Sequence, residues 1–201
     1  MTKHWILLIC IVLTAPLRAA GIFFIENPVV SPFGSALLGA TGLGTWPRQG
    51  QTFVTTQDAT FLYAEFYLTG GTPGDTSRYH ATLYTGDFSL QLASATGYTN
   101  SPDLGGYKRF SFNPTQIVAG KYAVVLNVDE RLPNVWIGYG YDANRYSGGV
   151  RVSSTDGGTT WTQSSTLDSA FRFALVPEPG TTCLLAASVL LLCIRSRKPT
   201  T

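Results

Sequence analysis

Apolar and polar residues alternate with a period of two along much of the chain between residues 51 and 176, a pattern typical of half-buried β-strands. In segment 120–129, for example, Tyr122, Val124 and Leu126 fall on one face. Short runs rich in Gly, Pro, Asn and Asp interrupt the alternation and indicate turns. The pattern predicts strands at residues 51–56, 59–70, 77–86, 107–113, 120–129, 134–142, 149–155, 159–164 and 169–176.

Two segments depart from simple alternation. Segment 59–70 is apolar on both faces, with Leu62 and Phe66 on one face and Phe61 on the other, so we expect a central strand. Segment 35–46 is Gly-rich and weakly periodic, and we expect a loop or an irregular edge strand there. Because helical periodicity is hard to find, the sequence predicts an all-β fold: an antiparallel β-sandwich, most simply of the jelly-roll type.

The first residues have the pattern of a secretory signal peptide, expected to span 1–21. Lys3 and His4 precede the apolar run 5–13, and the small residues of "TAPLRAAG" follow, as signal peptidase requires. An uncleaved membrane anchor is the alternative, but this apolar run is short for a bilayer core about 30 Å thick. We therefore expect export, with a folded domain from 22 to 176.

A second apolar run lies near the C-terminus. Residues 180–194 contain no charged side chain, and as a helix they would extend about 22 Å. We predict a short transmembrane helix at 181–194, followed by a basic end at 195–198. Its charged residues are expected to stop transfer of the chain across the membrane and to remain in the cytoplasm; they are Arg195, Arg197 and Lys198. A buried core helix is the weaker alternative, because the run has no amphipathic face.

Composition excludes several kinds of chemistry from the expected domain. Cys10, Cys183 and Cys193 all lie in the apolar ends, so disulfides, cysteine nucleophiles and cysteine zinc sites are not expected between residues 22 and 176. His80 is the only histidine in that span, which argues against a metal site. Nine Lys and Arg face eleven Asp and Glu there, so no nucleic-acid surface is indicated. We expect no cofactor.

The segment "SSTDGGTTWT" carries the most specific motif of the expected domain. It matches the Asp-box pattern S-x-D-x-G-x-T-W, in which the aspartate accepts hydrogen bonds from turn amides and the glycines allow positive φ. The motif resembles the structural staple of sialidases, but a single copy in a short domain favours hairpin stabilisation over that activity. With the closing segment 168–176, it also resembles jelly-roll domains of exported bacterial surface proteins. The motif residues are Ser154, Asp156, Gly158, Thr160 and Trp161.

Glu65 is the carboxylate considered for glycosidase chemistry, because it shares a strand face with Tyr63 and Tyr67. The structural alternative is an ion pair with an arginine such as Arg78 or Arg172. Catalysis would require a second carboxylate about 5 to 9.5 Å away, and no such partner is indicated. We therefore do not expect an enzyme, and a glycoside hydrolase is the third hypothesis.

Carbohydrate binding without catalysis is the second hypothesis. Exposed aromatic faces stack on sugar rings, and the C-terminal half of the domain is rich in Tyr and Trp, although aromatic residues of a sandwich more often belong to its core. The candidate glycan-binding residues are Tyr63, Glu65, Tyr67, Trp136, Tyr139 and Tyr141.

The junction before the C-terminal apolar run has a recognisable pattern. Its prolines fix an extended chain and remove amide donors, so neither helix nor sheet is expected to continue across it. The motif, the apolar helix and the basic end resemble, in order and spacing, the PEP-CTERM sorting signal, over residues 177–198. The resemblance implies a Gram-negative bacterium and processing by the membrane enzyme exosortase, after which the protein reaches the cell surface or the exopolysaccharide matrix. The motif residues are Pro177, Glu178, Pro179 and Gly180.

These observations favour an exported surface or matrix protein with a structural or adhesive role. Its expected partners are signal peptidase, an exosortase, the inner membrane by way of the C-terminal helix before processing, and exopolysaccharide as a candidate ligand.

Overall fold

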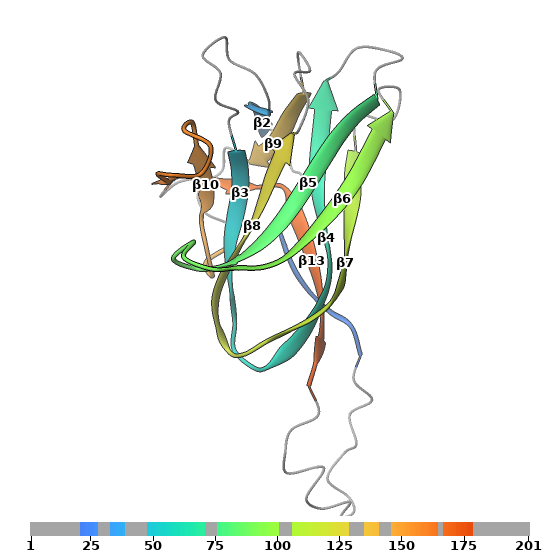
Figure 1. Cartoon of the computed structure of the whole chain (residues 1–201), viewed down its shortest axis with the longest axis vertical. Helices are drawn as coiled ribbons and strands as arrows, with labels where there is room; N and C mark the ends of the chain where they lie inside the picture. Colours follow the sequence, from blue (N-terminus) through green and yellow to red (C-terminus); the bar gives the residue numbers. More distant parts are fainter. Residues whose placement is uncertain are drawn as a thin grey trace, which may run out of the picture.

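The computed structural model describes residues 21–27, 33–38, 48–70, 76–100, 106–128, 135–140, 146–164 and 167–178. All regular elements of these residues are β-strands, and they form two antiparallel sheets (Figure 1). Sheet A contains β1 (Phe23–Asn27), β2 (Phe33–Leu38), β4 (Ala59–Gly70), β7 (Gly106–Ile117), β9 (Val135–Gly140), β12 (Asp168–Ser169) and β13 (Phe171–Pro177). Sheet B contains β3 (Arg48–Thr55), β5 (Thr76–Thr85), β6 (Gln91–Asn100), β8 (Gly120–Val128), β10 (Arg151–Ser154) and β11 (Thr162–Gln163). The prediction of an all-β, sandwich-like fold is confirmed.

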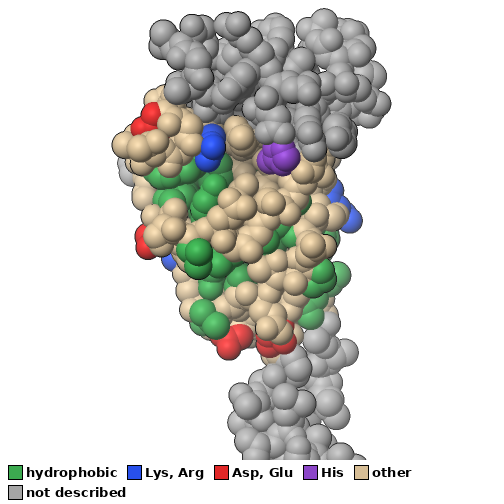
Figure 2. All heavy atoms as spheres, viewed as in Figure 1, with side chains coloured by type: hydrophobic (Ala, Val, Ile, Leu, Met, Phe, Trp, Pro, Cys, Tyr) green, Lys and Arg blue, Asp and Glu red, His purple; other side chains and the backbone are tan. Residues whose placement is uncertain are grey.

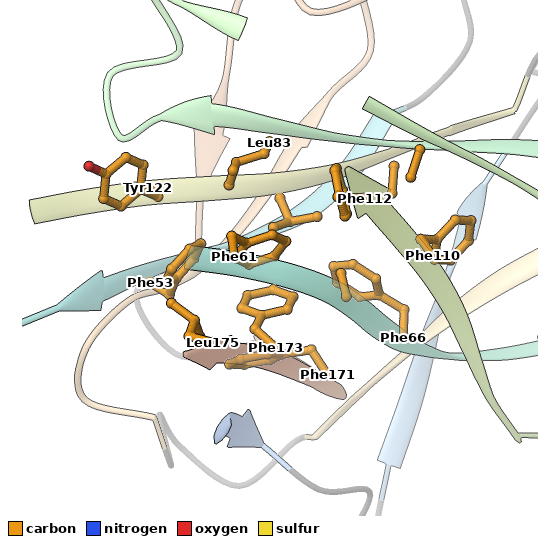
Figure 3. Close-up of a cluster of buried hydrophobic side chains, with 14 of the residues drawn as sticks. Phe53, Phe61, Phe66, Leu83, Phe110, Phe112, Tyr122, Phe171, Phe173 and Leu175 are labelled. Carbon is orange, nitrogen blue, oxygen red and sulfur yellow. The ribbon is translucent and has the colours of Figure 1, made fainter. Parts of the chain in front are cut away.

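An aromatic core fills the space between the sheets. Phe173 of β13 lies at its centre, with its ring centroid 5.0 Å from that of Phe53, 5.6 Å from that of Phe66 and 4.4 Å from that of Phe171 (Figure 3). All four side chains are fully buried. Because they come from β3, β4 and β13, this cluster joins sheet B to sheet A through apolar contacts.

β4 is the central strand of sheet A, as predicted, with β13 on one side and β7 on the other. The predicted assignment of its faces is wrong in its first half. The register to β13 shifts between Phe61 and Tyr63, so that Leu62 is an extra residue of β4, a β-bulge, and such a residue reverses the alternation of side chains. Phe61 therefore enters the core, and Leu62 is only half-buried.

A buried polar link joins the two sheets beside the aromatic core. The side-chain amide of Gln51, on β3, makes both bonds. Its Nε2 donates to Asp168 Oδ1 of β12 at 2.8 Å, and its Oε1 accepts a hydrogen bond from the backbone N–H of Ser169 at 2.8 Å. Burial raises the pKa of the Asp168 carboxyl. Since hydrogen bonds in a buried site are directional, this link fixes how β12 lies against β3.

The two ends of the described chain lie together. β1 pairs antiparallel with β13, and Phe23 is in register with Leu175. The described N-terminus and C-terminus therefore leave the sandwich at the same end, the lower end in Figure 1.

Candidate functional site

A row of alternating charges crosses the outer face of sheet A. The register places Glu26 of β1 opposite Arg172 of β13, Arg172 opposite Glu65 of β4, and Glu65 opposite Arg109 of β7. Since residues in register on neighbouring strands share one face, these four side chains form one continuous charge ladder. Its charges are balanced, with two carboxylates and two guanidinium groups.

Glu65 is the most enclosed member of the charge ladder, with 7% of its surface exposed. Its Oε1 accepts a hydrogen bond from Arg109 Nε at 2.9 Å and lies 2.8 Å from Arg109 Nη2. Its Oε2 lies 3.6 Å from Arg172 Nη1. Of the arginines expected as partners, Arg172 is therefore in place, and Arg109 is a partner that the sequence did not indicate.

The outer end of the charge ladder is more exposed. Arg172 donates from Nε to Glu26 Oε2 at 2.6 Å, with both side chains about two-fifths exposed. This hydrogen bond and the neighbouring carboxylates raise the pKa of the Arg172 guanidinium. Arg172 therefore remains charged between the two glutamates.

Aromatic rings flank the charge ladder. The Arg109 guanidinium lies 3.9 Å from the centre of the Tyr63 ring, a cation–π contact. Tyr67 and Tyr107 pack edge to face with centroids 5.6 Å apart, and Arg172 lies 5.6 Å from the Tyr107 ring. Tyr63, Glu65 and Tyr67 thus form one surface of sheet A together with two arginines. A surface of aromatic rings and charged hydrogen-bonding groups offers both stacking and polar contacts to a sugar.

For the other three predicted glycan-binding residues, the described part of the chain includes no side chain. Trp136 and Tyr139 belong to β9, where the backbone of Trp136 is in register with Thr69 and that of Tyr139 with Ser169. The side chains of both residues, and Tyr141 entirely, lie outside the described residues.

The Asp-box segment forms a closed turn between β10 and β11. Asp156 Oδ1 accepts hydrogen bonds from the amides of Thr159 at 3.0 Å and Thr160 at 2.9 Å, and from Ser154 Oγ at 2.7 Å. The Thr160 hydroxyl donates to Asp156 Oδ2 at 2.6 Å, and Ser154 Oγ accepts the Gly158 amide at 2.8 Å. These bonds, the Thr160 hydroxyl foremost, hold the pKa of the Asp156 carboxyl well below its usual range.

The turn also contacts a distant part of sheet B. Trp161 stacks on Phe88, with ring centroids 4.3 Å apart and planes at 11°. Phe88 lies in the β5–β6 turn and has a positive φ of 62°, unusual for a residue with a side chain. Because β3 and β8 separate β10 from β5 in sheet B, the stacked pair connects elements that share no backbone hydrogen bonds.

The first half of the predicted sorting motif is attached to the domain. Pro177 is the last residue of β13, in register with Ala59, so the sheet continues one residue beyond the expected boundary at Val176. The Glu178 amide donates to the Asp58 carbonyl at 3.0 Å, and its carboxylate accepts the Thr60 hydroxyl. A proline is tolerated at the end of a strand, because the backbone N–H that it lacks would make few of the hydrogen bonds to the neighbouring strand there.

The rest of the tail and the signal peptide lie outside the described residues, including Pro179, Gly180, the expected helix 181–194, and the basic residues Arg195, Arg197 and Lys198. Among the residues that the structure does describe, no helix is long and apolar enough to cross a membrane. The same residues hold no group of three or more His, Cys, Asp or Glu placed to bind a metal ion. No protein-family model and no curated protein matches this chain.

Proposed function

We propose that this chain is an exported protein of the cell surface or exopolysaccharide matrix, sorted by exosortase and structural or adhesive in role. The observation that carries the proposal is the C-terminal pattern 177–198, in which a Pro-Glu-Pro-Gly motif, an apolar run and a basic cluster follow one another. β1 begins and β13 finishes at the same end of the domain, so the expected signal peptide and the expected sorting signal both adjoin that end. This arrangement supports the proposal.

The test of sorting is the mature C-terminus. Mass spectrometry of protein recovered from native cells is expected to find a terminus between Pro177 and Gly180. A matched Pro179→Ala variant is expected to keep its tail. Recovery of chains that all end at Thr201 would refute the sorting proposal.

The domain itself is proposed to be of the jelly-roll type. Most connections between β3 and β9 pass from one sheet to the other, which supports this form. An experimental structure that traces the connections between sheets will test it.

Carbohydrate binding is the second candidate function, and the observation that favours it is the aromatic and charged outer face of sheet A. Tyr63 and Tyr67 lie on that face beside Arg109 and Arg172. A glycan array is the direct test, with Tyr67→Ala expected to weaken any binding and Phe88→Leu on sheet B as the control. Absence of binding to every glycan would exclude this candidate.

The structure gives less support to the third candidate, a glycoside hydrolase. A general acid must direct a proton at the substrate, whereas one oxygen of the Glu65 carboxylate accepts a hydrogen bond from Arg109 and the other faces Arg172, so both oxygens are engaged by arginines. Turnover of polysaccharide, if found, is expected to survive Glu65→Gln. Loss of that turnover in a folded variant would restore the catalytic hypothesis.

A further inference from the structure

The lower end of the sandwich in Figure 1 is a rim made of two turns and two strand ends. The Ala119 amide, in the β7–β8 turn, donates to Asp58 Oδ1, in the β3–β4 turn, at 2.8 Å. The Glu178 amide, directly after β13, donates to the Asp58 carbonyl at 3.0 Å. Asp58 thus joins both turns to the end of β13. The rim comprises Ile22, residues 56–58, Val118, Ala119, Pro177 and Glu178.

The tether between the rim and the expected membrane helix is very short. Glu178 is the last residue that the structure describes, and its hydrogen bond to Asp58 fixes it on the rim. Only two residues, Pro179 and Gly180, separate it from the helix expected at 181–194, which lies outside the described residues. Three Cα-to-Cα steps span at most about 11 Å, and a headgroup layer is about 6 Å thick. A rim tied so closely lies in or against the headgroups.

The length of the expected helix brings the rim still closer to the bilayer. Residues 181–194 would extend about 21 Å as a helix, about 9 Å less than a hydrocarbon core about 30 Å thick. Local thinning of the bilayer accommodates a helix that is too short. Thinning moves the membrane surface toward the rim, because the basic end holds the other end of the helix at the cytoplasmic headgroups.

The side chains of the rim suit the headgroup layer of a bilayer. Val118 is 65% exposed, more than any other large apolar side chain of the described residues, and Ile22 is 51% exposed. Single exposed apolar residues are ordinary on a protein surface, but these two stand at the end that carries the tether. The rim also has the carboxylates of Asp58 and Glu178, and Figure 2 shows acidic and apolar side chains together at the lower end. Carboxylates attract the ammonium groups of zwitterionic phospholipids.

We propose that, while the tail is intact, the rim rests on the outer surface of the membrane, with Val118 at the boundary between headgroups and acyl chains. The inference rests on the membrane anchor of the proposed function. The partner is a zwitterionic phospholipid bilayer, because the tether brings the rim to it and the rim pairs apolar side chains with carboxylates. A surface that binds anionic lipids would instead be rich in Lys and Arg.

The experiment places the full chain in phosphatidylcholine vesicles with brominated acyl chains, which quench the fluorescence of tryptophans that they contact. Val118→Trp puts the reporter on the rim. Ser94→Trp is the matched control, because Ser94 is also exposed and is in register, through Thr82, with Val125 of β8. Val125 lies five residues beyond Gly120, roughly 17 Å above the rim. After subtraction of the wild-type signal, quenching of Val118→Trp is expected to be at least roughly twice that of Ser94→Trp.

A longer tether tests the cause of the contact. Insertion of about ten Gly and Ser residues after Gly180 is expected to lower the quenching of Val118→Trp to the level of the control, because a flexible linker of that length spans roughly 17 Å more. Equal quenching of the two reporters, in chains whose tail resists extraction by alkaline carbonate, overturns the proposal. Quenching that the insertion leaves unchanged does so as well. Extraction of the wild type by carbonate would refute the membrane anchor, and the proposal with it.

Discussion

Replacing Glu65 with glutamine removes the central charge of the ladder while keeping the size of the side chain. The wild-type carboxylate accepts a hydrogen bond from Arg109 at 2.9 Å and lies 3.6 Å from Arg172. In the Glu65→Gln variant the side-chain carbonyl oxygen can still accept a hydrogen bond from one arginine. The NH2 group, which can only donate, then faces the other arginine. The expected result is a loss of folding free energy, since both guanidinium groups lose a charged partner.

The size of this loss follows from exposure. A hydrogen bond to a charged group contributes about 1.5 to 3 kcal/mol when it is well shielded, and an exposed ion pair contributes about 0.2 to 1 kcal/mol. The Glu65 side chain is 10% exposed, whereas that of Arg109 is 54% exposed. The Glu65 interactions lie between these limits, and we expect Glu65→Gln to lower the free energy of unfolding by about 1 to 2 kcal/mol.

Urea denaturation of the full chain, followed by near-ultraviolet circular dichroism, measures this quantity. Glu26→Gln is the matched control: it changes the exposed end of the same ladder and is expected to cost less than about 0.5 kcal/mol. A double-mutant cycle between Glu65→Gln and Arg109→Gln is expected to give a coupling of about 1 kcal/mol. The reasoning is refuted if Glu65→Gln costs no more than Glu26→Gln, or if the cycle shows no coupling.

Three further predictions concern the turns and the core. Gly157→Ala, at φ 74° with open space around its added Cβ, is expected to cost about 1 to 2 kcal/mol in urea denaturation. Gly158→Ala is expected to cost more, because its φ of 94° lies further from the left-handed region near about 57°, whereas Arg48 Nη1, 2.6 Å from the added Cβ, is the end of a flexible side chain and can move aside; equal costs would contradict this backbone strain. Phe173→Ala is expected to lose about 3 to 5 kcal/mol or to unfold the domain, and a loss below about 1 kcal/mol would contradict the core described. Carboxyl NMR is expected to give Asp87 a pKa of about 2, lowered chiefly by the hydrogen bond from the Thr85 hydroxyl. The stabilising effect of this carboxylate is complete above its ordinary pKa of 3.8 and is lost as the pH falls through about 2. A pKa near 3.8 would contradict those hydrogen bonds.

The sequence predicted most strands, because a period of two is a local pattern that survives wherever one face is buried. It missed β6, whose Ala, Ser, Thr and Gly residues provide no bulky apolar alternation. The structure gives the reason: Ala95 is buried, and a Cβ at Gly97 would lie only 3.1 Å from the Phe110 ring, so small residues suffice on this strand. The sequence also missed the bulge at Leu62, because the residues on either side of it are apolar in either register.

The candidate site was predicted only in the part that one strand contains. Tyr63, Glu65 and Tyr67 share a face of β4 by simple alternation, and the sequence shows this directly. The partners Arg109 and Arg172 come from β7 and β13, and their registers with β4 are set by pairings distant in the chain. The stack of Phe88 on Trp161 is missed for the same reason, because nothing local relates the two turns.

β1 begins and β13 finishes at one end of the sandwich. A tether attached at either described terminus therefore holds the domain by that same end. The opposite end, where β4 finishes, is turned away from the tether.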